Sequence, residues 1–140
     1  TGKILKILND YQIEFEVIPE YDLVHYFDKI TKLFIGTQSL TNDNQLICDP
    51  GTSNIVSECH IHDIPIYLFL KTLKFSHFPA SDQNILKNSY KDKHEGINYN
   101  FSIHSNDIIK LDLISHIITE KGDINLEDIS SIREQILTNN

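Results

Sequence analysis

The side chains best suited to acid–base chemistry at neutral pH are the seven histidines, because imidazole titrates close to pH 7. They are scattered, most of them in polar stretches, and stand at His25, His60, His62, His77, His94, His104 and His116. The sequence contains no G-x-S-x-G motif, and no Ser/His/Asp set can be picked out from it. The histidines therefore do not predict a hydrolytic site.

The two cysteines, Cys48 and Cys59, are the other reactive side chains, and two cysteines do not make a disulfide framework. Cys59, His60 and His62 form a Cys-His-x-His cluster at the end of a predicted helix. Adjacent helix positions point to different faces, and a zinc site needs a second ligand pair elsewhere. We therefore expect a buried cysteine with surface histidines, and neither a metal nor a cofactor.

Gly51 and Thr52 stand where a helix is expected to begin, and free backbone N–H groups at a helix start attract anions. The nearby Asp49 works against this, because its negative charge repels an anion. Asp49-Pro50-Gly51-Thr52 is also typical of a turn, and the Thr52 hydroxyl could cap the helix. We favour turn and cap over ligand binding.

Strand and helix patterns alternate along the chain. Helices are expected over residues 2–9 and 22–29, after Thr52, and after Asn125, where Ile129, Ile132 and Ile136 should be buried. Strands are expected over residues 12–18, 32–36, 45–48 and 64–70, and the strand at 32–36 should be covered on both faces. Residues 76–100 lack periodicity and predict a long surface excursion, whereas the period of 108–118 is ambiguous.

This alternation predicts an α/β fold: a Rossmann-like three-layer domain with a mainly parallel sheet and helices on both faces. The 140 residues, 40% of them hydrophobic, are enough for one such domain spanning residues 1–140. The sequence contains neither G-x-G-x-x-G nor a P-loop, so the fold is expected without the dinucleotide fingerprint.

The net charge of −8 argues against a nucleic-acid surface, which needs a basic face. It is compatible with a protein partner that carries a basic patch, and equally with a role in solubility alone. No apolar run approaches the roughly 18 residues of a membrane span, and no secretory signal is present. We expect a cytoplasmic protein that binds neither nucleic acid nor membrane.

Several short segments occur in a characteristic order: LFIGTQSL (33–40), PGT (50–52), IPIY (64–67), LKF (73–75) and IITEKG (117–122). Their order and spacing resemble the C-terminal domain of the alpha, beta and delta subunits of translation initiation factor 2B. The same domain occurs in methylthioribose-1-phosphate isomerase and ribose-1,5-bisphosphate isomerase. The resemblance covers almost the whole chain and implies a C-terminal domain without the family's helical N-terminal domain. In the family, the first strand of the sheet lies upstream of the position that matches the start of this chain. This favours a fragment whose sheet lacks an edge strand.

The resemblance also implies what the site has lost. Gln38 stands where the isomerases carry a catalytic aspartate, and a neutral amide cannot take a proton from a sugar at neutral pH. Cys48 and Asp49 replace an Asn-Lys pair, and the family's catalytic cysteine lies upstream of this chain. Lys74 matches a family lysine at the sugar-phosphate site. The vestigial ligand-binding residues are thus Gln38, Cys48, Gly51, Thr52 and Lys74, with no catalytic residue.

The expected function is a non-catalytic regulatory or scaffold subunit in translation initiation. The resemblance implies that the C-terminal domains form a homo- or heterodimer and help to bind initiation factor 2. A divergent relative with a task other than guanine nucleotide exchange is equally compatible. Two alternatives stay open: a sugar-phosphate aldose–ketose isomerase whose site has drifted, and a sensor that binds a sugar phosphate or nucleotide without turning it over.

Overall fold

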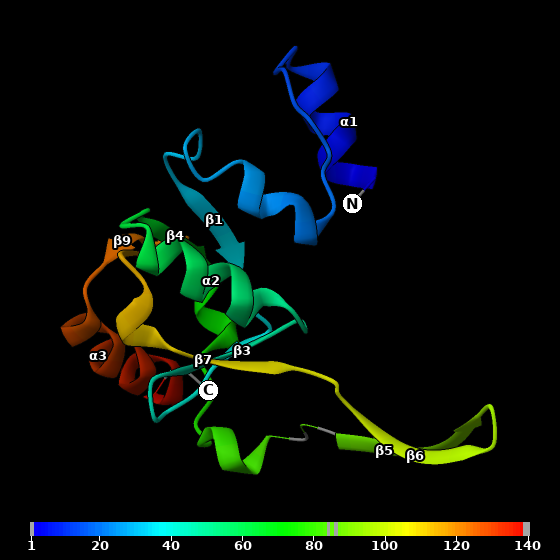
Figure 1. The fold of residues 1–140 in the computed structure, drawn as a ribbon. Coiled ribbons are helices and arrows are strands. Elements are labelled where there is room, and N and C mark those ends of the chain that lie inside the picture. The colour runs from blue at the N-terminus through cyan, green and yellow to red at the C-terminus, as the bar shows by residue number, and fades with distance from the viewer. Residues whose placement is uncertain (1, 84, 86, 139–140) are drawn as a thin grey trace.

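The computed structural model describes residues 2–83, 85 and 87–138, and Figure 1 shows how their elements are arranged. The helices are α1 (Gly2–Asp10), α2 (Thr52–Ile61) and α3 (Leu126–Thr138). Short 3-10 helices are η1 (Glu20–His25), η2 (Thr72–Lys74), η3 (Ala80–Asp82) and η4 (Leu111–Leu113). The strands are β1 (Leu33–Gly36), β2 (Ser39–Leu40), β3 (Gln45–Cys48), β4 (Ile66–Phe69), β5 (Lys87–His94), β6 (Ile97–His104), β7 (Asp107–Lys110), β8 (His116–Thr119) and β9 (Gly122–Ile124).

The main sheet has the strand order β1-β4-β8-β9, in which the first three strands are parallel and β9 is antiparallel. Parallel neighbours cannot be joined by a tight turn, and α2 lies in the long crossover from β1 to β4. β2, β3 and β7 form a smaller antiparallel sheet. The mainly parallel sheet with its helices confirms the predicted α/β, Rossmann-like class.

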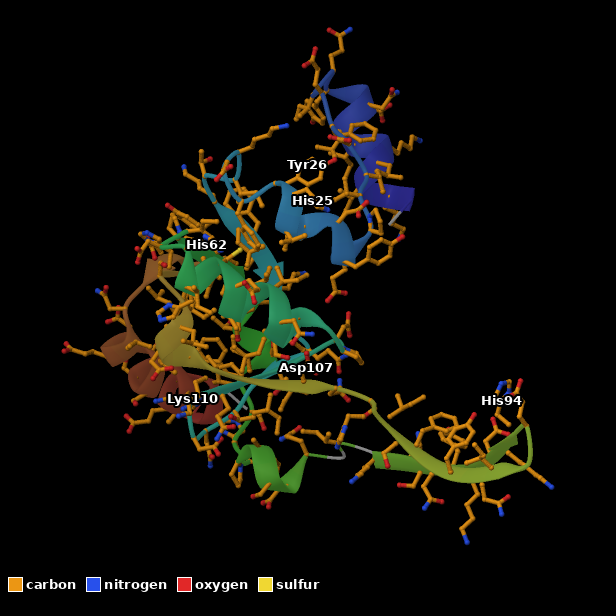
Figure 2. The ribbon with its side chains drawn as sticks, viewed as in Figure 1. His25, Tyr26, His62, His94, Asp107 and Lys110 are labelled. Carbon is orange, nitrogen blue, oxygen red and sulfur yellow. The ribbon has the colours of Figure 1, made fainter. Side chains whose placement is uncertain are left out.

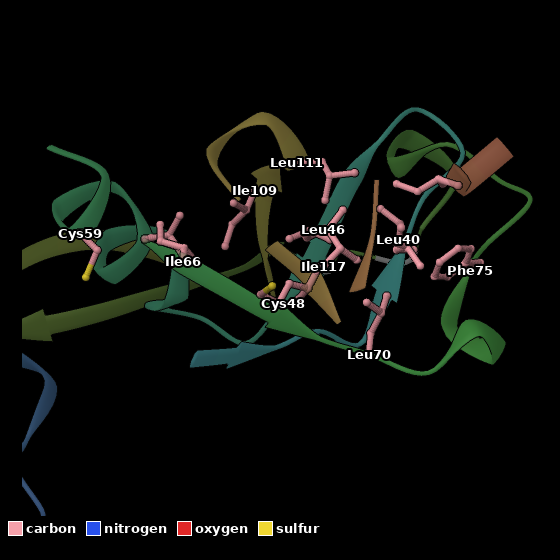
Figure 3. Close-up of a cluster of buried hydrophobic side chains, with 14 of the residues drawn as sticks. Leu40, Leu46, Cys48, Cys59, Ile66, Leu70, Phe75, Ile109, Leu111 and Ile117 are labelled. Atoms are coloured by element: carbon pink, nitrogen blue, oxygen red, sulfur yellow. The ribbon is translucent and has the colours of Figure 1, made fainter. Parts of the chain in front are cut away.

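The hydrophobic core lies among one face of the main sheet, the smaller sheet, α2 and α3 (Figure 3). In β4, Ile66 and Leu68 point into it and are 1% and 0% exposed. The helix residues predicted to be buried contribute as expected: Cys59, Ile129 and Ile132 are buried, and Ile136 is partly buried. Val56 and Ile55 of α2 join them, buried and partly buried respectively. Full burial of an aliphatic side chain stabilises a fold by about 1.5–3 kcal/mol, so this cluster holds the sheets and helices together.

The opposite face of the main sheet is aromatic and largely exposed. Phe34 of β1 is 63% exposed and packs edge-on against Tyr67 and Phe69 of β4. Tyr67 stacks on His116 of β8 with ring centroids 4.3 Å apart. The prediction that residues 32–36 would be covered on both faces is therefore wrong. β1 is an edge strand, and only alternate residues of it turn towards the core.

The N-terminal segment lies away from the core (Figure 1). The predicted helix is present as α1, but it buries no residue, and Ile4 and Ile7 are 63% and 54% exposed. The strand predicted at residues 12–18 is wrong: the segment belongs to no strand. Its alternating pattern is real, but a strand exists only where a neighbouring strand accepts its backbone hydrogen bonds. The helix predicted at 22–29 is reduced to η1 followed by turns.

Residues 76–100 were expected to be a surface excursion without regular structure, and that expectation is wrong in part. Residues 84 and 86 lie outside the described residues, but β5 and β6 pair along their whole length as an antiparallel hairpin. Glu95 and Gly96 form the turn with φ angles of 50° and 85°, as a type I′ hairpin turn requires. Every hairpin residue is exposed, and the hairpin projects from the body (Figure 1). Residues 108–118 resolve into β7, η4 and β8.

Candidate functional site

The candidate site is a pocket of about 470 Å³ near the carboxyl ends of β1 and β3, beside the start of α2. Three of the predicted site residues line it: Gln38, Thr52 and Lys74. Thr37 and Asp49 also contribute to the wall. Open α/β sheets commonly bind ligands at the carboxyl ends of their strands. The fold has thus brought together residues that are spread over 37 sequence positions, from Thr37 to Lys74.

The Gln38 side chain is held by hydrogen bonds at both ends of its amide. Its Nε2 donates to Asp49 Oδ1 at 2.6 Å, and its Oε1 accepts from Asn106 Nδ2 at 3.0 Å. Asn106 Nδ2 also lies 3.3 Å from the backbone oxygen of Cys48. Because the amide has a donor end and an acceptor end, it suits this position between an aspartate and an asparagine. A carboxylate at position 38 would have no hydrogen to donate to Asp49, and the two negative charges would repel each other.

Cys48 is 1% exposed and lies beside the pocket, not in its lining. Its Sγ is 3.6 Å from Thr37 Oγ1 and 3.8 Å from the backbone oxygen of Gly36. Burial raises the pKa of the Cys48 thiol above its ordinary value. Cys48 is therefore a neutral thiol at pH 7, and its chemistry is that of a small apolar side chain.

Lys74, from η2, is the only cation lining the pocket among the residues that the structure describes. Its Nζ donates a hydrogen bond to the backbone oxygen of Thr37. The Thr37 hydroxyl is hydrogen-bonded in turn to the backbone oxygens of Ile47 and Ser39, at 2.8 and 2.9 Å. The ammonium group is thus held against the pocket wall by this hydrogen bond. The carboxylate of Asp49 lines the same cavity.

The start of α2 differs from the prediction that Thr52 caps the helix. The N-cap residue is Gly51, whose φ of 94° places it in the left-handed region, and the Thr52 hydroxyl donates to the backbone oxygen of Asp49 at 2.7 Å. A substitution at Gly51 would be strained, since residues with a Cβ rarely adopt this φ. A Cβ there would also lie 2.6 Å from Glu20 Oε1.

Asp107 accepts the hydrogen bonds that the helix start offers. Its Oδ2 lies 2.9 Å from the backbone nitrogens of both Gly51 and Ser53 and 2.7 Å from Ser53 Oγ. Burial alone would raise the pKa of Asp107, but the hydrogen bonds from Ser53 and Gly51 outweigh it, and the pKa lies below its usual range. The position that the sequence suggested for an anion is filled by the protein's own carboxylate (Figure 2).

Sequence reasoning missed both Asn106 and Asp107. Asn106 lies between the hairpin strand β6 and the core strand β7, and Asp107 is the first residue of β7; both stand more than 50 positions beyond the residues they bind. No local motif marks them. One physical argument could have pointed to Asp107: the free N–H groups at a helix start need a hydrogen-bond acceptor.

The structure places the other candidates outside this pocket. His62 stacks on Phe27 with ring centroids 4.3 Å apart, and Cys59 is buried in the core. Within residues 2–83, 85 and 87–138, no group of three or more His, Cys, Asp or Glu side chains could hold a metal ion. No helix in those same ranges has the length and apolar character needed to cross a membrane.

Comparison with known proteins finds a matching family. The family described as the Initiation factor 2 subunit family matches residues 2–126. A translation initiation factor eIF-2B subunit 2-like protein of Pyrococcus abyssi is 30% identical over 79 residues, which make up 56% of this chain and 29% of that protein. The chain therefore spans less than a third of this relative's length.

Solved structures show the same fold at low sequence identity. The translation initiation factor eIF-2B of Pyrococcus horikoshii OT3 matches with a TM-score of 0.71 at 22% identity, over 91% of this chain and 46% of that one. The tetrameric eIF2B-beta2-delta2 complex of C. thermophilum gives 0.70 at 17% identity, over 93% and 39%. The 5-methylthioribose 1-phosphate isomerase of P. horikoshii OT3 gives 0.69 at 11% identity, over 88% and 37%.

Proposed function

The chain belongs to the Initiation factor 2 subunit family, and we propose that it works there as a non-catalytic regulatory or scaffold subunit. In this proposal its task is to bind sister subunits and initiation factor 2 in the cytoplasm and so to take part in the control of guanine nucleotide exchange. The family's fold is also that of an isomerase. The choice between the two roles therefore depends on the side chains of the site and not on the fold.

The observation that carries the proposal is the way the site residues bind one another. Asp107 occupies the helix start, Gln38 bridges Asp49 and Asn106, and Lys74 donates to a backbone oxygen. Aldose–ketose isomerisation needs a base that moves a proton between neighbouring carbons. The amide of Gln38 cannot be that base, and an anionic substrate in the pocket would meet the carboxylate of Asp49.

Assembly with other subunits is supported by a matching solved structure and by the exposed surface of this chain. One matching structure is a tetrameric complex of beta and delta subunits. This chain carries exposed apolar side chains of the kind that mark protein interfaces, among them Phe34 and Phe69 on the open face of the main sheet. Its charge of −8 suits a partner with a basic patch.

The test is a pull-down of the alpha subunit of initiation factor 2 with this chain, with sedimentation velocity run alongside to measure the oligomer. Saturable binding by a defined assembly is the expected result. An unrelated acidic protein of equal net charge serves as the control, because it measures capture by charge alone. A chain that stays monomeric at high concentration and captures neither initiation factor 2 nor a sister subunit would rule the proposal out.

A second candidate function is a sensor of sugar phosphates or nucleotides, and the pocket itself favours it. The cavity of about 470 Å³ is lined by Gln38, Thr52 and Lys74, so a ligand that displaced Lys74 from its backbone oxygen would find a cation. A ligand at about 100 times its Kd stabilises a fold by about 2.7 kcal/mol, which a thermal shift measures. The Lys74→Gln variant is the matched control. A flat response of the wild type across sugar phosphates and nucleotides would exclude this function.

A further inference from the structure

The open edge of β1 offers backbone groups to a further strand. Among the described strands, β1 pairs with β4 alone, and the two are parallel. The N–H of Leu33 donates to the backbone oxygen of Pro65 at 3.0 Å, so Leu33 and Ile35 turn their backbone groups towards β4. The N–H and C=O of Phe34 point the other way, to the open edge. A strand edge of this kind is a template for pairing.

Residues 13–17 have the pattern of such a strand and are unpaired in the described structure. Ile13, Phe15 and Val17 alternate with Glu14 and Glu16, and all five side chains are exposed. Within the described part of the chain, no backbone group of residues 14–18 is hydrogen-bonded to another segment. Alternation of this kind is typical of a strand that buries one of its faces.

The connection over residues 19–32 already follows the path of a crossover between parallel strands. It begins beside the start of α2, where a Cβ on Gly51 would lie 2.6 Å from Glu20 Oε1. It then runs along α2, because η1 and α2 line one groove, and Phe27 stacks on His62 at the end of the helix. From there the chain enters β1. This connection and α2, the crossover from β1 to β4, therefore lie side by side and run in the same direction.

The handedness of crossovers decides on which side of β1 the preceding strand belongs. Parallel strands are joined by right-handed crossovers in nearly all cases, so two crossovers on one face of a sheet step across it in the same direction. The step from β1 through α2 to β4 leads away from the open edge. The strand that precedes residues 19–32 thus belongs on the open edge, and this connection exceeds the dozen or so residues that a parallel pair needs.

We propose that residues 13–17 add to the open edge of β1 as a parallel strand, and that the described arrangement is the open state of this strap. In the closed state the apolar side chains of the strap lie on the same face as Ile35, in the part of the candidate pocket lined by Ile35 and Ile55. Burial of these side chains favours closure. The closed strap narrows the pocket to its polar end, at Gln38 and Lys74. This closure is independent of the proposed function, because it needs contacts within one chain only.

The opposite face of the closed strap suits solvent. Glu14 and Glu16 then lie on the same face as Phe34 and the aromatic surface, where Lys32 lies over the ring of Tyr67 at 5.6 Å from its centroid. Carboxylates beside this lysine are favoured by charge, and both remain hydrated. The charge pattern of the segment thus agrees with the orientation that buries Phe15.

Hydrogen exchange of the Phe34 amide, measured by NMR on the whole chain, tests the closure. The open state leaves this N–H without an acceptor, whereas the closed state hydrogen-bonds it to the strap. We expect exchange at least about tenfold slower than in the unfolded chain. Phe15→Pro removes an N–H that the closed strap turns towards β1, so it should abolish this protection. Glu14→Pro is the matched control, because the N–H of residue 14 points to solvent and an edge strand tolerates proline there.

Slow exchange of the Leu68 amide, in the buried strand β4, shows that each variant is folded. Rapid exchange of Phe34 in the wild type, or equal exchange in the two proline variants, would overturn the closure. The strap of a second copy is the competing occupant of the edge. It would make the protection of Phe34 rise with protein concentration as a dimer appears in sedimentation velocity, and that result would also overturn closure within one chain. Protection that does not change with concentration supports it.

Discussion

Asp107 accepts two hydrogen bonds from Ser53, one from its backbone N–H at 2.9 Å and one from its hydroxyl at 2.7 Å. The two residues are 54 positions apart, so the contact fastens the start of α2 to the strand β7. The preceding residue, Asn106, binds Gln38, so the segment that follows the hairpin supplies two residues to the candidate site. The carboxylate of Asp107 itself connects the helix start to the core strand β7.

The first prediction is that Asp107→Ala destabilises the fold. The substitution leaves the N–H groups of Gly51 and Ser53 without their acceptor, and loss of a helix cap costs about 0.5–2 kcal/mol. Urea denaturation at pH 7 measures the free energy of unfolding. Asp112→Ala is the control, since Asp112 is exposed and a surface change of this kind stays within about 0.5 kcal/mol. Equal losses in the two variants would contradict the capping role.

The second prediction concerns pH. The pKa of Asp107 in the folded protein lies below its unfolded value of about 3.9, so its contribution to stability is complete above about pH 5 and is lost as pH falls through the folded pKa. The pKa values of Asp43 and Glu120 are lowered too, chiefly by hydrogen bonds from Thr41 and Thr72. Acid therefore destabilises both the wild type and the Asp107→Asn variant. The difference between their free energies of unfolding reports the contribution of Asp107 alone.

That difference should be largest near neutral pH and should shrink between about pH 5 and pH 3. Denaturation curves of both proteins at several pH values measure it. Asp107→Asn retains an oxygen that can accept from the helix start, so the variant stays folded for the comparison. A gap between the two proteins that is constant from pH 7 to pH 3 would show that the charge of Asp107 makes no contribution.

The third prediction tests the bridge made by Gln38. Gln38→Asp replaces the amide that donates to Asp49 with a second carboxylate, so it should destabilise the fold at pH 7 by about 0.5–1 kcal/mol, the scale of exposed charge interactions. It should create no isomerase activity. Asp49→Asn added to Gln38→Asp should recover most of the loss, because the repulsion then disappears. Additive effects in this double-mutant cycle would mean that the two side chains do not interact.

The site residues predicted from the sequence came by two routes. Gly51 and Thr52 follow a proline turn, which is a local signature, whereas Gln38, Cys48 and Lys74 were implied by the resemblance to the family. The fold brings Gln38, Thr52 and Lys74 to one pocket. Asn106 and Asp107 have no such signature, since they act across more than 50 positions. Long-range hydrogen bonds of this kind depend on the strand register, which no local pattern encodes.

Two of the errors in the fold have a common cause. Ile13, Phe15 and Val17 alternate as a strand does, yet the segment pairs with no strand in the described structure. Residues 87–104 look irregular because one face of the hairpin is made of lysine, serine and asparagine, yet the two segments pair fully around the Glu95–Gly96 turn. Strand formation is decided by the partner strand as much as by the pattern, and the partner is not visible locally.

The final prediction is that neither thiol reacts before the protein unfolds. Cys48 and Cys59 are 1% and 0% exposed, and burial raises the pKa of both thiols, so each is a neutral group shielded from solvent. The thiolate is the reactive form, and a reagent reaches it only after the core opens. Alkylation by iodoacetamide at pH 7 should therefore be far slower in the native protein than in urea, with both cysteines modified in proportion to the population of the opened protein. The Asp107→Ala variant should speed the labelling of both, because it lowers the free energy of opening. Rapid labelling of Cys48 alone in the native protein would instead show that the pocket opens onto its thiol without global unfolding.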